Sequence, residues 1–459
     1  MFSSVRIAGL AFVMLTAFTV GTGGTAAQES VNDAQFRTDV DFPNSLAFYL
    51  TVTAPVTIDH AEVRYTVDQI SCSSGVATGI AEFSPTSQLD ISWEWGLRET
   101  GGIPVGARIK YQWVLSGGDR TFETPETTIV FEDPRFDWRT IESEHIHLQW
   151  YAGSESFAQD LLEVANSGIE QLRASTGVLP SKPVVVRIFD DAQAMRDGII
   201  FGQDWAGGIS YPTYGLVGIG VNSSNLDWGR RAMVHEMTHV VVGEAAFSCG
   251  AGVPGWLTEG LAMYNEGPLE APMRNTLNGA ITDNSAFAIR SLAANFPADH
   301  DGAILSYSQS QSVIDYLVST FGPSQMNELL TSFAATGTID RSLTNVYGFD
   351  SDGLDQRWRT WVGLPVRAPQ TGPMVVPLPT VPPLGLPPSP TPTPEIEPVE
   401  AEAAPIYRTS TPLPTHGPPT SSGGGGCNRS EGGASGLDAS VAGILALFAT
   451  LSMRRRKRK

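Results

Sequence analysis

The sequence predicts a chain of several domains: an all-β sandwich of immunoglobulin-like type, then an α+β domain, a disordered proline-rich stalk and a C-terminal membrane helix. Apolar residues first alternate with a period of two, later recur at helical spacing, and finally give way to a long proline-rich stretch. At 459 residues the chain also exceeds the roughly 150 residues of one typical domain. The predicted boundaries are 1–27 for a secretion signal, 28–135 for the sandwich, 140–365 for the α+β domain, 366–436 for the stalk, 437–453 for the membrane or sorting helix and 454–459 for a basic tail.

The first 27 residues have the features of a secretion signal. Arg6 precedes an apolar run over residues 7–20, and the small residues Thr25, Ala26 and Ala27 indicate cleavage near Gln28. We therefore expect the folded parts of the chain to lie outside the cytoplasm.

The predicted mature chain is strongly acidic. Arg6 and the six basic residues at 454–459 belong to the predicted signal and tail, which leaves 22 basic against 48 acidic residues, a net charge of −26, over residues 28–453. Because such a surface repels phosphates, nucleic acid is not expected as a partner.

The three cysteines do not form a disulfide framework. In an oxidising compartment, one bridge between Cys72 and Cys249 is possible. The alternative is that both are unpaired, partly buried thiols. The third, Cys427, lies just after the proline-rich stretch 365–426.

Short alternating segments separated by turn residues fill residues 45–133. A period of two with aromatic and β-branched residues on the inward side is typical of an antiparallel sandwich. No catalytic constellation falls within it, so its expected role is a spacer or a docking module. The alternating runs are Leu46, Phe48, Leu50 and Val52; Ala61, Val63, Tyr65 and Val67; Ile91, Trp93 and Trp95; and Ile109, Tyr111, Trp113 and Leu115.

The next region begins with strands and continues with helices, which favours an α+β domain. Strands are predicted at 146–150, 184–189 and 215–221, with a helix at 154–176 between the first two. Further helices are predicted near 285–296, 307–321, 324–333 and 354–362.

Residues 365–426 are rich in proline, threonine, serine and glycine, a composition that forms an extended, semi-rigid stalk rather than a core. The uncharged run 439–453 is shorter than the roughly 20 residues that span a membrane comfortably. With the basic cluster 454–459, it resembles the C-terminal sorting signals of bacterial surface proteins, in which Cys427 would be a processing or lipidation point. A plain membrane anchor with an incidental cysteine is the alternative.

The segment RAMVHEMTHVVV, residues 231–242, places two histidines four residues apart. On a helix, which we expect to be capped by Asp227, His235 and His239 project from one face, while Glu236 lies about 100° away, within reach of a water molecule. A chance match to this pattern is expected on the order of once in a hundred such chains, so an ordinary pair of histidines is the weaker interpretation. A catalytic zinc site takes three protein ligands and a water, so a third ligand is required.

Downstream, VPGWLTEGLAMYNEG, residues 253–267, predicts a second helix with Pro254 at its first position. With this segment the chain resembles the gluzincin metallopeptidases, and most closely the bacterial peptidase MA-like group related to aminopeptidase N and thermolysin; the resemblance covers residues 142–364. It implies one zinc ion with Glu259 as the third ligand. It also implies that Glu266 supports a ligand histidine from behind, although a solvated carboxylate at the end of the helix is equally compatible with the sequence.

The resemblance further implies roles in catalysis. Glu236 would act as general base on the water that the zinc activates. Tyr307 would donate a hydrogen bond to the developing oxyanion, with Tyr316, Tyr264 or, less favourably, His300 as alternatives. The other interpretation of Tyr307 is a packing residue. The segment 215–221 occupies the place where relatives have an edge strand for substrate, although an ordinary core strand fits the sequence as well.

The function that the resemblance implies is a zinc endopeptidase anchored at the cell surface, with peptides or proteins as substrates and the membrane as partner. The GxMEN-type segment that grips a substrate amino terminus in aminopeptidases is missing, which argues against an exopeptidase. The alternative is a non-catalytic binding or adhesion protein with a structural zinc domain. The oligomeric state is left open.

Overall fold

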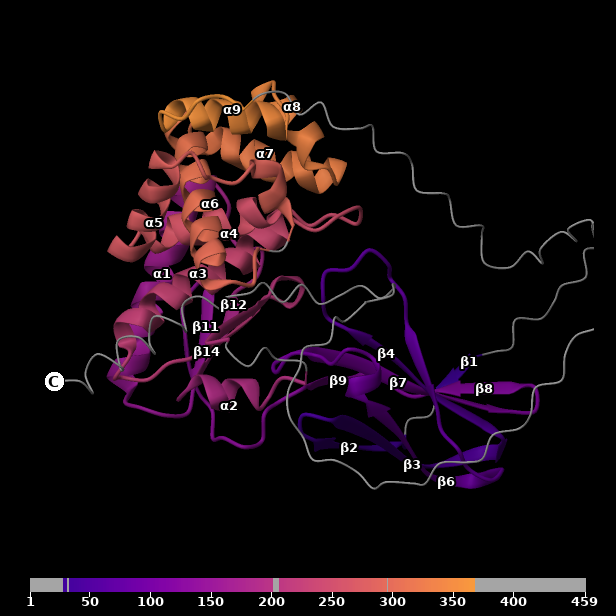
Figure 1. Ribbon diagram of the computed structural model, residues 1–459. Coiled ribbons are helices and arrows are strands. Elements are labelled where there is room, and N and C mark those ends of the chain that lie inside the picture. The colour runs from indigo at the N-terminus through magenta and orange to yellow at the C-terminus, as the bar shows by residue number, and fades with distance from the viewer. Residues whose placement is uncertain (1–27, 31–32, 201–205, 295, 368–459) are drawn as a thin grey trace, which may run out of the picture. The chain divides into compact units, whose positions relative to one another are not determined.

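The structure is a computed structural model that describes residues 28–30, 33–200, 206–294 and 296–367 (Figure 1). The predicted secretion signal, stalk, C-terminal helix and basic tail lie outside these residues, apart from the first two residues of the stalk, and so does Cys427. Within the described part of the chain, no helix is both long enough and apolar enough to cross a membrane.

The N-terminal part, here called the β domain, consists of two sheets. The smaller sheet is antiparallel and has the order β2-β3-β6. The larger has the order β1-β8-β7-β4-β5, with β9 also paired to β7, and only its β1–β8 pairing is parallel. The strands are β1 (Gln28–Ser30), β2 (Gln35–Asp41), β3 (Ser45–Ile58), β4 (His60–Val67), β5 (Ala77–Ile80), β6 (Thr86–Gly96), β7 (Arg108–Gly117), β8 (Arg120–Glu123) and β9 (Thr127–Val130).

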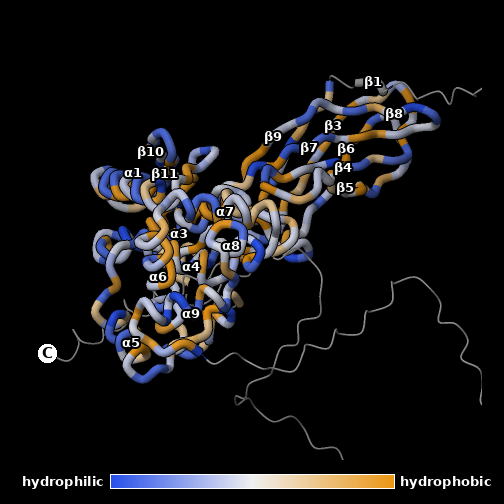
Figure 2. The backbone as a smooth tube through the Cα atoms, turned by 90° about the horizontal axis from the view of Figure 1, so that it is seen from above, coloured by the Kyte–Doolittle hydropathy of each residue, from blue (hydrophilic) through white to orange (hydrophobic). Residues whose placement is uncertain are grey.

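The alternation predicted from the sequence builds the core of the β domain. Every second residue of β3 from Leu46 to Val52 is buried, and the buried positions of β7, such as Trp113, belong to the same core. Figure 2 shows polar and apolar segments alternating along these strands. The prediction of a β-rich N-terminal region is therefore confirmed, and the long strand β3 shows the predicted alternation of buried and exposed residues.

The second part, here called the helical domain, is built on a mixed sheet with the order β10-β11-β12-β14-β13. The three inner strands are parallel, and both edge strands are antiparallel to their neighbours. The predicted strands at 146–150, 184–189 and 215–221 are confirmed. The full set is β10 (Arg139–Glu142), β11 (Ile146–Trp150), β12 (Val184–Phe189), β13 (Gly208–Tyr211) and β14 (Leu216–Gly220).

Of the two interpretations of residues 215–221, an edge strand or a core strand, the core strand is the one that the structure has. The strand β14 lies between β12 and β13 and is buried throughout. The edge next to the zinc-helix candidate is β13, which is only four residues long. A turn over residues 212–215 joins the two strands into a hairpin, and this turn was the signal that could have revealed β13.

Helices cover the sheet and continue after it. The bounds are α1 (Glu155–Thr176), α2 (Ala192–Arg196), α3 (Leu226–Ala245), α4 (Gly255–Glu266), α5 (Ala271–Thr282), α6 (His300–Phe321), α7 (Pro323–Thr336), α8 (Ile339–Tyr347) and α9 (Ser351–Trp361), with short 3-10 turns η1 (Leu97–Glu99), η2 (Pro212–Tyr214) and η3 (Ile289–Ala293). Helices α3, α4 and α6 pack side by side (Figure 1). The helices predicted at 154–176, 324–333 and 354–362 are confirmed within a few residues.

Two helix predictions need correction. Helix α6 begins seven residues before Tyr307, because the side chain of Asp299 accepts a hydrogen bond from the amide of Gly302 and caps it there. The predicted helix at 285–296 is reduced to the turn η3. Side chains from other helices take its backbone groups: Gln309 bonds both the amide and the carbonyl of Phe287.

The start of α3 also differs slightly from the prediction. Its N-cap is Asn225, and Asp227 lies in the first turn, 3.4 Å from Arg230. An acidic residue there still favours the helix dipole. Pro254 likewise precedes α4 as its N-cap rather than standing at its first position.

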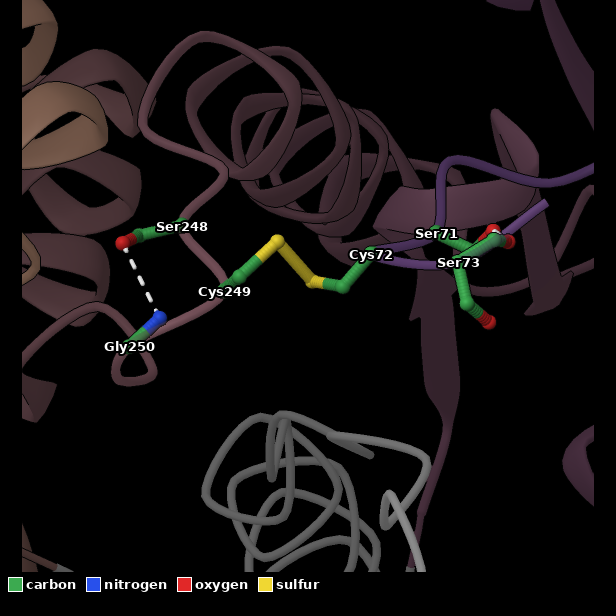
Figure 3. The surroundings of a disulfide bond; sticks show 6 residues. All are labelled: Ser71, Cys72, Ser73, Ser248, Cys249 and Gly250. Carbon is green, nitrogen blue, oxygen red and sulfur yellow. Dashed lines mark hydrogen bonds between the residues drawn. A yellow bond between two sulfur atoms is a disulfide. The ribbon is translucent and has the colours of Figure 1, made fainter. Parts of the chain in front are cut away.

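A disulfide between Cys72 and Cys249 joins the two domains, so these two cysteines are paired and are not free thiols. Cys72 lies between β4 and β5, Cys249 lies between α3 and α4, and their Cα atoms are 5.5 Å apart (Figure 3).

We expect Gly260→Ala to destabilise the helical domain, because a Cβ at Gly260 would lie 2.6 Å from the Ser310 carbonyl oxygen and 2.7 Å from Ile314 in α6. The expected loss is about 1–3 kcal/mol. The matched control is Gly279→Ala in α5, where nothing lies within 4 Å of the added Cβ, and a gain of about 0.5–1 kcal/mol is expected from helix propensity. Urea unfolding of both variants measures the difference, and equal shifts would contradict the close approach of α4 to α6.

Candidate metal centre

Helix α3 supplies two imidazoles to one buried point. His235 and His239 are four residues apart, and their Nε2 atoms lie 3.1 Å from each other. Both side chains are almost fully buried because α3 packs against the sheet on one side and against α4 on the other. The two nitrogens thus face the same small space.

Helix α4 brings a carboxylate to the same point. Glu259 Oε2 lies 3.4 Å from the Nε2 atom of His235 and 3.4 Å from that of His239. Gly260, the next residue, allows α4 to lie close to α6. Within the described residues, these three side chains form the one group of three metal-binding side chains whose ligand atoms all lie within 4.8 Å of one another.

The outer nitrogens of both rings are held by hydrogen-bonding partners. His235 Nδ1 lies 2.6 Å from Glu266 Oε1, and His239 Nδ1 lies 2.9 Å from the hydroxyl of Thr258. Because these contacts engage Nδ1, the Nε2 lone pairs are left to point inward. The Glu266 side chain is fully buried, which excludes the solvated alternative.

A further pair of contacts holds Glu266. Arg231 Nη2 lies 3.0 Å from Glu266 Oε2, and Arg231 Nη1 lies 3.1 Å from Glu270. Sequence reasoning missed Arg231 and Thr258. Arg231 could have been found, because it precedes His235 by four residues and therefore shares its helix face.

The arrangement fits a metal ion. A tetrahedral zinc ion with bonds of about 2.0–2.1 Å separates its ligand atoms by about 3.3 Å. The three separations here are 3.1, 3.4 and 3.4 Å. Glu259 Oε2 is buried and has no hydrogen-bond partner among the described residues, as expected of an oxygen that binds a cation.

Glu236 lies beside this group without joining it. Both of its carboxylate oxygens are buried and have no hydrogen-bond partner among the described residues. Burial raises its pKa, while the positive charge of the neighbouring histidines acts in the opposite direction. The edge strand β13 passes so close that a Cβ at Gly208 would lie 2.8 Å from Glu236 Oε1, so any larger residue there would require the Glu236 carboxylate to shift.

The charges of the group are tightly coupled. Burial by itself would lower the pKa of His235, but the carboxylates of Glu259 and Glu266 outweigh it and raise the pKa well above the usual value. Burial would raise the pKa of Glu259, but the two histidines lower it to about 2. The pocket of side chains therefore favours a positive charge at its centre.

Of the three tyrosine candidates, Tyr307 is the one whose pKa is affected by the carboxylates of the site. It is buried, it packs edge-on against Phe296, and burial followed by the carboxylates of the site raises its pKa, so that it keeps its proton. Tyr316 packs against Phe321 and Trp361 instead.

The other candidates have weaker links to the site. The pKa of Tyr264 is raised by burial and then by Asp315, which is not one of the carboxylates of the site. His300 is exposed at the first position of α6.

Comparison with known proteins agrees with the resemblance found in the sequence. Residues 164–363 match the model of the Peptidase MA superfamily, and this range contains all the side chains of the centre. No curated protein sequence matches the chain.

Solved structures give only distant likenesses. A mutant of the M1 zinc metallopeptidase from Deinococcus radiodurans is 14% identical, with 75% of this chain and 96% of that chain covered and a TM-score of 0.33. An aminopeptidase N family protein from Idiomarina loihiensis is 8% identical, with 72% and 71% covered and a TM-score of 0.26. The human F-spondin reeler domain is 11% identical, with 24% and 96% covered and a TM-score of 0.16. With scores this low, none of these likenesses supports the assignments below.

We expect Glu266→Gln to weaken zinc binding by roughly 10–100-fold, because the carboxylate behind His235 would be lost while the shape is kept. The matched control is Glu270→Gln, which removes only the half-exposed second partner of Arg231 and should change the affinity little. Competition with a chromophoric chelator measures both. Unchanged affinity in Glu266→Gln would mean that His235 is held by packing alone.

Proposed function

We propose that this protein is a zinc-dependent endopeptidase that hydrolyses peptide bonds, because residues 164–363 match the model of the Peptidase MA superfamily. The observation that carries the proposal is the convergence of His235, His239 and Glu259 on one point, with the unpartnered carboxylate of Glu236 beside it. The same motif without a third ligand would support only a pair of buried histidines.

In this proposal His235, His239 and Glu259 hold one zinc ion, and Glu266 orients His235. A bound zinc ion supplies a Lewis acid, which polarises the scissile carbonyl and makes water more acidic. The protein contributes the fixed directions of the three ligand atoms. It also contributes an apolar surrounding in which those charges act strongly.

Glu236 is suited to move protons. Its oxygens accept no hydrogen bond from the described residues, so they are free to accept the proton of the attacking water. Burial raises its pKa and makes it a stronger base than an exposed carboxylate. The protonated acid can then donate to the leaving amine as the peptide bond breaks.

Tyr307 is suited to donate a hydrogen bond to the oxyanion. Its hydroxyl keeps its proton, because burial and the nearby carboxylates of Glu259 and Glu236 oppose ionisation. A neutral donor held rigidly by packing against Phe296 needs no reorganisation when charge develops on the carbonyl oxygen.

The edge strand β13 offers backbone groups to a peptide. The amide of Gly220 donates to the carbonyl of Gly207 at 2.9 Å, which continues the β13–β14 register by one pair. Since antiparallel pairs alternate between bonded and non-bonded residues, Ile209 is the next residue bonded to β14. The amides and carbonyls of Gly208 and Ser210 therefore face away from β14, where a substrate strand can pair.

The setting of the enzyme is also a proposal. We place it outside the cytoplasm, attached to the cell surface by its C-terminal segment, with an immunoglobulin-like sandwich as its β domain. The Cys72–Cys249 bridge supports this setting, because such bonds persist in oxidising compartments. Endopeptidase activity is supported because the sequence lacks the GxMEN-type segment that grips the amino terminus of a substrate in aminopeptidases.

We expect Glu236→Gln to reduce the cleavage of casein and of a mixed peptide library by at least about 100-fold, because the base is lost. The zinc content, measured by elemental analysis, should not change. Glu244→Gln, on the same helix but outside the centre, is the matched control and should retain full activity. Equal cleavage by all three proteins would remove Glu236 from its role. Zinc binding without cleavage of any peptide by the wild type would favour the binding or adhesion protein.

We expect Tyr307→Phe to lower kcat by roughly 10²–10³-fold with little change in KM, because a donor that acts on the oxyanion stabilises only the transition state. Tyr316→Phe, on the same helix but packed against Phe321, should leave both constants unchanged. Steady-state kinetics on one peptide measures both variants. A change in KM alone would assign Tyr307 to substrate binding instead.

A further inference from the structure

A loop of the β domain reaches the helical domain beside the candidate site. This loop, residues 68–76, connects β4 and β5 and is called the arm below. It makes three contacts with the helical domain. The Ile70 amide donates to the Thr213 carbonyl at 2.8 Å, Asp68 lies 3.4 Å from Lys182 Nζ, and Cys72 is bonded to Cys249.

The open edge of β13 ends close to the arm. Gly208 and Ser210 face outward, and the next outward position is Pro212, which has no amide to donate. Pro212 also packs tightly against α3, since a Cβ at Gly243 would lie 2.5 Å from it. The ladder available to a peptide therefore stops after Ser210.

Beyond Pro212, the backbone of the arm forms a hydrogen bond with the carbonyl of Thr213. The Thr213 carbonyl is the acceptor of the Ile70 amide and is not available to a substrate. Thr213 lies three residues after Ser210 and within the turn η2, so the two residues are less than about 10 Å apart, the length of three extended residues. A peptide paired with β13 would meet the backbone of the arm within that distance.

The disulfide is what keeps the arm in this place. The Asp68–Lys182 pair is largely exposed, and such pairs contribute little. A single backbone hydrogen bond between the half-buried residues Ile70 and Thr213 would also yield to a competing strand. The Cys72–Cys249 bond anchors the arm to the loop between α3 and α4, ten residues from His239 and ten residues from Glu259.

We propose that the arm limits the N-terminal side of the bound substrate, so that the enzyme prefers bonds within about four residues of a free amino terminus. Antiparallel addition to β13 is the more stable pairing, and it directs the N-terminal side of the peptide towards Pro212 and Ile70. The inference rests on the proposed peptidase function and narrows it. It concerns only this side of the site, because residues 201–205, which precede the other end of β13, are not described.

The test uses two series of fluorogenic peptides with the same scissile bond. In one series the N-terminal side grows from one to eight residues, and in the other the C-terminal side grows. For the full-length wild type we expect kcat/KM to fall at least tenfold once the N-terminal side exceeds about four residues. In the double variant Cys72→Ser/Cys249→Ser, kcat/KM for the long peptides should rise by this factor, whereas kcat/KM for the short peptides should not change. The C-terminal series should respond equally in both proteins.

A second measurement separates this inference from the proposed function. Binding of the same peptides is measured by fluorescence anisotropy in the Glu236→Gln background, with and without the two serine substitutions, so that no hydrolysis is needed. Wild type treated with a phosphine reductant replaces the double variant if that variant does not fold. The inference about the arm is supported if long peptides bind more weakly than short ones and if the serine substitutions or reduction restore their affinity. This holds even if nothing is cleaved. Equal rates or affinities for all N-terminal lengths, or a length limit that survives release of the arm, would overturn it.

Discussion

The structure depends on one electrostatic constraint, which is that two buried imidazole nitrogens and a buried carboxylate oxygen face one another at 3.1–3.4 Å. Lone pairs directed at a common point repel unless a cation lies between them. The hydrogen bonds that the outer ring nitrogens donate to Glu266 and Thr258 fix this direction rather than relieve the repulsion. The packing of α3, α4 and α6 thus stabilises an arrangement that is complete only with a positive charge at its centre.

The charges around that point suggest how large the positive charge must be. Glu236, Glu259 and Glu266 are all buried, and Arg231 pairs with Glu266. The carboxylates of Glu236 and Glu259 remain, and their two charges match those of a divalent cation. Burying carboxylates without such compensation would be costly, and they would take up protons instead. The two remaining carboxylates and the ligand geometry are thus both compatible with a divalent cation.

The parts of the fold that the sequence predicts are those with a strong local pattern. The alternating strands of the β domain are of this kind, because every second residue is buried there. Helix α3 is predicted instead from the spacing of its two histidines. Strand β13 is only Gly-Ile-Ser-Tyr, too short to show a period, and η3 is shaped by Gln309 from another helix. Whether Cys72 and Cys249 pair depends on tertiary packing. So does the contact between Arg231 and Glu266, although the helix face that Arg231 shares with His235 indicates that Arg231 lies near the site.

The β domain is more closely joined to the catalytic scaffold than a spacer would be. In β12 the residues Val184, Val186 and Ile188 pack into the core shared with the helices, whereas Arg187 points to the opposite side of the sheet. There its guanidinium lies over Trp138 and donates to Glu132 at 2.5 Å. Because an arginine that is 3% exposed loses most of its hydration, this contact is stable only while both domains keep their places. The same strand thus supports the metal-binding helices with one face and meets the β domain with the other, which gives the arm a firm base from which to reach the edge of the site.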